Sequence, residues 1–236
     1  MRGHVTKKFN SKNMTQKEAL KGLRILYPIW IVAGLFSLMY VPSKLITEDA
    51  VQTANNILGN ELLFRLGIAG SLFSQLLFIF AVILLYHLFK SVSRMCTMNM
   101  LVFALVSVPI AMISTLLQIA ALELAGNNND LMLLFLNLNK QGIIIASIFW
   151  GLWLFPLGNL IRQSGYFPKF IAPAVMLGGA GYFFGSFAQL IMANPEKIMP
   201  LFELLTLGEM VFIFWLIIKG ARLPERAESG GGDEGK

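Results

Sequence analysis

Charged side chains inside strongly apolar segments are the places where this sequence could carry chemistry. Glu61 and Arg65 lie four residues apart in "NELLFRLGI" (60–68), at the start of one of the most apolar stretches of the chain. At helical spacing, an acid and a base four residues apart share one face and can form an ion pair. Charge within a membrane span is costly and is often functional. These two residues are therefore the first candidates for a site.

Other polar residues continue this pattern along one face of each apolar segment. At 100° per residue, Glu61 and Arg65 share a helix face with Ser71 and Gln75. The same calculation gives every later segment one polar or glycine-rich face. The candidate ligand-binding cluster is Glu61, Arg65, Gln75, Gln118, Lys140, Gln141, Gln189, Glu203 and Glu209. Small residues let helix backbones approach, so Gly178, Gly181 and Gly185 are assigned to helix packing.

Motifs for catalysis or metal binding are missing from the sequence. There are two histidines, His4 and His87, and neither belongs to an HExxH motif. No GxSxG elbow and no glycine-rich phosphate loop occurs. The single cysteine, Cys96, excludes an intramolecular disulfide. We therefore predict no metal, no cofactor and no catalytic residue.

The composition identifies the elements that must position these residues. Hydrophobic residues make up 56% of the chain and charged residues 14%, with a mean hydropathy of +0.67. These values indicate a membrane protein. Strands of a membrane barrel alternate polar and apolar residues, whereas these runs are apolar on nearly all sides. We predict an all-α, polytopic integral membrane bundle with six transmembrane helices, at 25–41, 62–89, 98–124, 142–161, 169–192 and 201–218.

The basic residues orient this bundle. If six spans alternate, fifteen of the nineteen basic residues lie on one side, together with both termini. Basic loops stay cytoplasmic, so both termini are predicted inside the cell. The chain then divides into a basic cytoplasmic arm (1–24), a membrane domain (25–218) and a flexible cytoplasmic tail (219–236). The net charge of +6 is explained by this topology and by anionic lipid, so the bilayer and not nucleic acid is the expected partner.

This topology predicts a polar cavity in the extracytoplasmic half of the bundle. The polar residues that fall in that half are Arg65, Glu123, Lys140, Gln189, Glu203 and Glu209. We expect the Arg65 side chain to point inward and to neutralise an acid of the last span, with Glu209 preferred over Glu203. In that arrangement an unpaired buried charge would be strongly destabilising.

Three blocks of the sequence resemble a known family. They are "NILGNELLFRLGI" (56–68), "IFWGLWLFPLGNLIRQSGYFPKFIAPAVMLGGAGYFFGSF" (148–187) and "LGEMVFIFWLIIKG" (207–220). They are similar to a prokaryotic family of six-helix membrane proteins, the domain of unknown function 4386. The resemblance implies that Arg65 and Glu209 belong to the family pattern, and it implies no activity. Pro173 departs from the glycine that such proteins more often have after the turn.

Two classes of function follow from this pattern. In the first, the cavity binds a small molecule, an ion or a lipid, as in a transporter or a receptor. In the second, the protein is a structural or regulatory subunit that binds another membrane protein or a second copy of itself. An intramembrane enzyme is a third and less favoured reading. An inverted repeat between 25–124 and 142–218 would favour transport, but the sequence shows no convincing one. The expected location is the prokaryotic cell (inner) membrane.

Overall fold

The computed structural model describes residues 14–224 and is helical in all its regular elements. Six of its helical segments are long and apolar enough to cross a membrane, as the sequence predicts. The molecule is therefore a multi-pass membrane protein of the all-α class. The spans are Gln16–Leu45, which combines α1, a π-helical segment and α2, then α4 (Glu61–Phe89), α5 (Arg94–Leu124), α6 (Asn129–Ser164), α7 (Ile171–Ile191) and α8 (Met199–Ile218).

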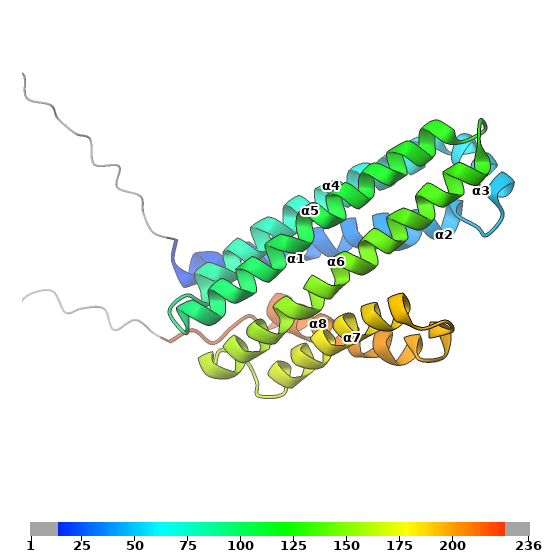
Figure 1. Cartoon of the computed structure of the whole chain (residues 1–236). Helices are drawn as coiled ribbons and strands as arrows, with labels where there is room; N and C mark the ends of the chain where they lie inside the picture. Colours follow the sequence, from blue (N-terminus) through cyan, green and yellow to red (C-terminus); the bar gives the residue numbers. More distant parts are fainter. Residues whose placement is uncertain (1–13, 225–236) are drawn as a thin grey trace, which may run out of the picture.

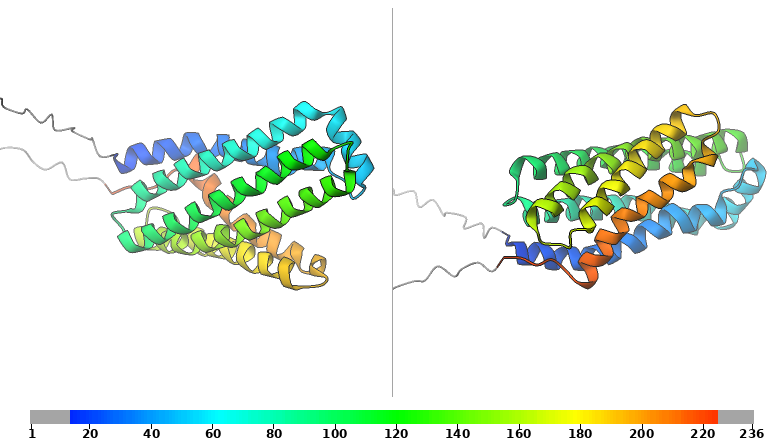
Figure 2. Two further views of the ribbon diagram at one scale, coloured as in Figure 1. Left: turned by 45° about the horizontal axis from the view of Figure 1, so that its top comes forward. Right: turned by 90° about the horizontal axis from the view of Figure 1, so that it is seen from below.

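The six spans lie roughly side by side, and both described ends of the chain leave at the same end of the bundle (Figures 1 and 2). Each of α4, α5, α6, α7 and α8 packs on its neighbour in sequence, and the first span packs on α4. The first span also meets α8, over a shorter stretch. An even number of spans explains why the two ends lie together.

Side-chain caps fix where the helices begin. The Thr15 side chain accepts a hydrogen bond from the Glu18 backbone N–H, and the Glu18 carboxylate accepts one from the Thr15 backbone. Ser93 caps α5 and Asn128 caps α6 through the same kind of bond. These bonds satisfy backbone donors that the first helical turn leaves free.

The first span changes its winding where it passes the middle of the bundle. Residues Phe36–Tyr40 form a π-helical segment, in which the Val41 N–H donates to the Phe36 carbonyl. Pro42 lies two residues after this segment, and proline in a regular helix would lose a hydrogen bond and clash with the carbonyl four residues earlier. The wider π turn accommodates this conflict, and such turns occur often at functional sites.

Four spans are longer than a bilayer core requires, namely Gln16–Leu45, α4, α5 and α6. The 31 residues of α5 extend about 46 Å at 1.5 Å per residue, against about 30 Å of hydrocarbon. α6 begins at Asn129, thirteen residues before the predicted start of its span at residue 142. At the end of the bundle opposite the described termini, which the predicted topology makes the outer end, α3 (Ala50–Gly59) packs with these extensions. The contact forms a second apolar core that includes Ile57, Phe64 and Met132. The extensions continue beyond the ends of α7 and α8 (Figure 1).

The structure describes only part of the two predicted terminal regions. Within the predicted arm, Gln16–Arg24 is the first part of α1. Residues 1–13 and 225–236 lie outside the described part of the chain. The remaining span boundaries agree with the predicted ones to within a few residues, except at the first span and at the start of α6.

Candidate ligand-binding site

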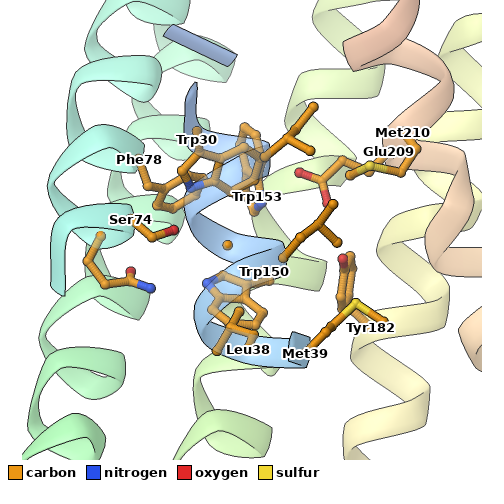
Figure 3. Close-up of a pocket in the computed structure, with 14 residues that line it drawn as sticks. Trp30, Leu38, Met39, Ser74, Phe78, Trp150, Trp153, Tyr182, Glu209 and Met210 are labelled. Atoms are coloured by element: carbon orange, nitrogen blue, oxygen red, sulfur yellow. The ribbon is translucent and has the colours of Figure 1, made fainter. Parts of the chain in front are cut away.

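A pocket of about 210 Å³ lies between the first span and α4, α6, α7 and α8. It is mostly apolar, and its polar side chains come from Ser74, Gln75, Tyr182 and Glu209 (Figure 3). Pockets of this kind, with a few convergent polar groups, are typical of small-molecule sites, although most sites for drug-sized ligands are larger. The volume favours a small ligand.

The pocket lies at the middle of the spans. Glu209 is ten residues from the start of α8 and nine from its end, and Gln75 is fourteen residues from either end of α4. The sequence predicted a cavity in the extracytoplasmic half, with polar walls. The observed pocket is deeper and more apolar, because charged residues nearer the outer ends of the spans face away from it.

Glu209 is the acidic group of this pocket. Its side chain is 5% exposed, and Figure 3 shows it across the pocket from Ser74, with the Tyr182 side chain beside it. No lysine or arginine of residues 14–224 lies within 4.0 Å of its carboxylate. A buried carboxyl group of this kind must either carry a proton or receive a cation from elsewhere.

Aromatic rings form two walls of the pocket. Trp30 stacks on Phe78 with ring centroids 5.7 Å apart, and Trp153 meets the same ring edge-on at 5.4 Å. On the other wall, Trp150 meets Tyr182 edge-on at 6.2 Å. The indole N–H of Trp150 donates to the Ser107 hydroxyl at 3.1 Å, which fixes the orientation of that ring.

Gln75 connects the pocket to a small polar void nearer the outer end. Its side-chain carbonyl oxygen is buried and has no hydrogen-bond partner within the described chain. The void has a volume of about 20 Å³, enough for one water molecule. Beyond it, Gln118 donates to the Asn139 side chain at 3.1 Å, and Asn139 donates to the Ser114 carbonyl at 2.7 Å. Polar groups therefore continue outward from the pocket between α4, α5 and α6.

The predicted pairing of Arg65 with an acid of the last span is wrong. Arg65 instead donates to Glu61 on its own helix at 2.7 Å, and both side chains are about half exposed. The pair lies in the first two turns of α4, whereas Glu209 lies at the middle of α8. Because Glu61, four residues earlier on the same helix, already pairs with Arg65, the Arg65 side chain does not reach into the bundle.

The structure separates the predicted polar cluster into two groups. Gln75 and Glu209 line the pocket, and Gln75 and Gln118 line the neighbouring void. The other members line neither. Glu61, Arg65, Lys140, Gln141 and Glu203 are exposed, and Gln189 is half-buried.

The glycines assigned to packing lie between α7 and α8. A Cβ added to Gly181 would lie 2.7 Å from the Phe202 carbonyl oxygen, and one added to Gly178 would lie 3.0 Å from the Glu209 backbone nitrogen. Gly185 faces the Phe202 side chain in the same way. The partner on α8 is Gly208, which the sequence reasoning missed; an added Cβ there would collide with the Ala174 carbonyl oxygen. These contacts place Glu209 directly against α7.

The aromatic walls were also missed by the sequence reasoning. Tryptophan is enriched at the two membrane interfaces, but Trp30, Trp150 and Trp153 lie well inside their spans. This unusual depth, together with the spacing of three between Trp150 and Trp153, was the available signal. It would have directed attention to the same depth as Glu209.

No group of three or more histidine, cysteine, aspartate or glutamate side chains within residues 14–224 is arranged to hold a metal ion. Cys96 donates its thiol to the Pro156 carbonyl at 3.4 Å and contacts Asn159. It therefore packs between α5 and α6, away from the residues that line the pocket.

Comparison with known proteins supports the resemblance seen in the sequence. Over 81 residues, or 34% of this chain, it is 36% identical to an uncharacterized protein of Archaeoglobus fulgidus. That match spans about half of the relative, 48% of its length. No solved structure matches the chain. The profile of the "Domain of unknown function (DUF4386)" matches residues 25–220. The matched range contains all six spans except the first turns of α1. The chain therefore belongs to this family.

Proposed function

We propose that this membrane protein binds a small molecule in the mid-membrane pocket, as a transporter or a receptor does. The observation that carries the proposal is that Glu209 and Gln75 line the same pocket. Both are buried within the spans. The Gln75 side-chain oxygen has no hydrogen-bond partner in the described chain, and the Glu209 carboxylate, although it lies beside the Tyr182 hydroxyl, has no cationic partner there. Buried polar groups without partners are costly, so a ligand that satisfies them would be favoured.

The fold supplies two further arguments for binding. The pocket borders the π-helical segment Phe36–Tyr40, a local irregularity of the kind that often accompanies function. The polar groups around Gln118 and Asn139 extend from the pocket toward the outer end of the bundle. This arrangement supports exchange of ligand or water with the extracytoplasmic side. Family membership and the archaeal relative support a location in a prokaryotic cell membrane.

A subunit that binds another membrane protein is the second candidate. A glycine-rich helix face is one surface through which such a subunit could bind its partner. In the structure, Gly178, Gly181 and Gly185 contact α8 of the same chain. A partner or a second copy would therefore have to use a different face, and binding in the pocket has the stronger support.

Filling the pocket tests the proposal. Gly34 lines the pocket, and a Cβ there would have only one neighbour within 4 Å, Ser74 at 3.8 Å. Gly34→Phe should therefore occupy the space without a clash at its Cβ. The matched control is Ile113→Phe, on an exposed position of α5.

The measurement is energy transfer from the protein's tryptophans to 1-aminonaphthalene, an uncharged fluorescent arene, in lipid nanodiscs. Three of the four tryptophans line the pocket, so bound probe is excited efficiently. We expect a saturable signal in the wild type and in Ile113→Phe, and only the linear signal of lipid-dissolved probe in Gly34→Phe. A saturable signal that survives in Gly34→Phe would contradict the proposal, as would its absence from the wild type.

A further inference from the structure

The pocket combines a carboxyl group with aromatic walls, and this combination points to the charge of its ligand. Glu209 is buried at the middle of a span, where an ionised carboxylate is stable only beside a cation. The nearest cationic side chain along its helix is Lys219, beyond the end of α8. Within the described chain, no cation reaches the carboxylate. A ligand can therefore supply the positive charge that the described chain does not place beside this carboxylate.

The aromatic rings favour the same charge. The face of a tryptophan or tyrosine ring attracts a cation, and cages of such rings recognise quaternary ammonium groups. Here three tryptophans, from α1 and α6, line one pocket together with Tyr182 and Glu209. Trp150 is held in place by Ser107, so its ring is fixed before a ligand arrives.

An inorganic cation fits this pocket poorly. Calcium and magnesium require six or more oxygen ligands, whereas the oxygen-bearing side chains of the pocket are Ser74, Gln75, Tyr182 and Glu209, spread over three helices. The rest of the lining is apolar or indole. An anion would be repelled by the Glu209 carboxylate. An organic cation, with one positive group and an apolar body, matches both parts of the lining.

The open side of the pocket suits an apolar substituent. Leu35, Leu38 and Met39 of the first span line it and are also exposed on the outer surface of the bundle. At the cytoplasmic end, α1 is tied to α8 by Arg24, which donates to the Ile217 carbonyl at 3.0 Å. The two helices diverge toward the other end (Figure 2). A ligand with a hydrophobic part would therefore contact apolar side chains from the pocket to the surface.

We infer that the pocket selects organic cations, namely quaternary ammonium compounds or protonated amines with an apolar substituent, with Glu209 as the counter-ion and Trp30, Trp150 and Trp153 as its aromatic walls. This inference rests on the proposed function and adds the ligand class to it.

The test compares two molecules of the same shape, benzyltrimethylammonium and its uncharged isostere neopentylbenzene. Each is titrated against 1-aminonaphthalene bound to the protein in nanodiscs, with free aqueous concentrations measured to correct for partition into lipid. The variants are Glu209→Gln, which removes the charge and keeps the shape, and Glu203→Gln, which changes an exposed acid on the same helix.

We expect the wild type and Glu203→Gln to bind benzyltrimethylammonium at least tenfold more tightly than neopentylbenzene. In Glu209→Gln, the cation should lose at least tenfold in affinity while the neutral isostere keeps its own. Equal affinities in the wild type would overturn the inference, and so would a cation preference that persists in Glu209→Gln. If Glu209→Gln does not fold, the comparison of the two molecules in the wild type still decides.

Failure of the inference is distinguishable from failure of the proposed function. Saturable binding of 1-aminonaphthalene without preference for the cation would leave a small-molecule pocket and remove its selectivity. Absence of a saturable 1-aminonaphthalene signal from the wild type, which the displacement measurement itself requires, would remove both.

Discussion

At the scale of single residues, the pair that attracted attention in the sequence is not the pair that matters for the site. Arg65 and Glu61 form an ion pair on the surface of α4. In the described chain, buried Glu209 has no cationic partner, and the buried side-chain oxygen of Gln75 has no hydrogen-bond partner. Helical phase predicted which residues share a face of one helix. It could not predict which neighbouring helix that face meets, and the nearer partner of Arg65 was on its own helix.

The surface position of the Arg65–Glu61 pair determines the expected effect of removing Arg65. Exposed ion pairs contribute about 0–1 kcal/mol, and both side chains here are about half exposed. Arg65→Ala should therefore lower the free energy of unfolding by no more than about 1 kcal/mol. Thermal unfolding in detergent, beside Glu61→Ala, measures this change. A loss of 3–5 kcal/mol, the range for a stranded buried charge, would restore the inward orientation.

At the scale of helices, the apolar runs of the sequence were enough to find the spans. The start of α6 was missed because its first turns, around Asn137, Asn139 and Lys140, are too polar for a membrane span. Those turns pack on α5 and α3 at the outer end, where a long tertiary contact stabilises helix outside the apolar run. The π turn at Phe36–Tyr40 was also beyond sequence reasoning, although Pro42 marks its position.

The contact between α7 and α8 yields a prediction at this scale. A Cβ at Gly208 would collide with the backbone carbonyl of Ala174, which cannot move independently of its helix. Gly208→Ala should destabilise the protein by about 1–3 kcal/mol, the usual cost of overpacking. The matched control is Gly59→Ala, where an added Cβ has no neighbour within 4 Å.

Thermal unfolding of both variants in the same detergent separates the loss of α7–α8 packing from the general effect of replacing glycine by alanine. The control should be neutral or slightly stabilising, because alanine restricts the unfolded chain more than glycine does. Equal melting temperatures for Gly208→Ala and the wild type would mean that α7 and α8 do not approach this closely.

At the scale of the whole molecule, six spans place the two ends of the described chain, residues 14 and 224, on one side of the bilayer. The distribution of basic residues predicts that this side is the cytoplasm. The pocket then lies midway between the two aqueous phases, and its polar extension through Gln118 runs toward the outside. The depth of the pocket could not be predicted from charge placement, because it depends on how the spans pack.

Cysteine labelling tests this orientation. Cys96 is a poor reporter because it packs against Pro156, so it is first replaced by alanine. Asn127→Cys and Ser91→Cys then place exposed thiols at opposite ends of the bundle. In intact cells, an impermeant maleimide should label Asn127→Cys, and it should label Ser91→Cys only after permeabilisation. The reverse pattern would invert the topology.

The central claim, that a small molecule occupies the mid-membrane pocket, is tested most directly by locating one there. Crystals soaked with 4-bromo-1-aminonaphthalene, a brominated form of the uncharged probe, would show the bromine by its anomalous scattering. We predict an anomalous peak between the Trp30 and Trp150 walls, within contact distance of Glu209 or Gln75. A peak found only in the lipid-facing groove between α1 and α4, around Val32 and Phe73, would contradict the account, as would a saturating soak that leaves the pocket without bromine.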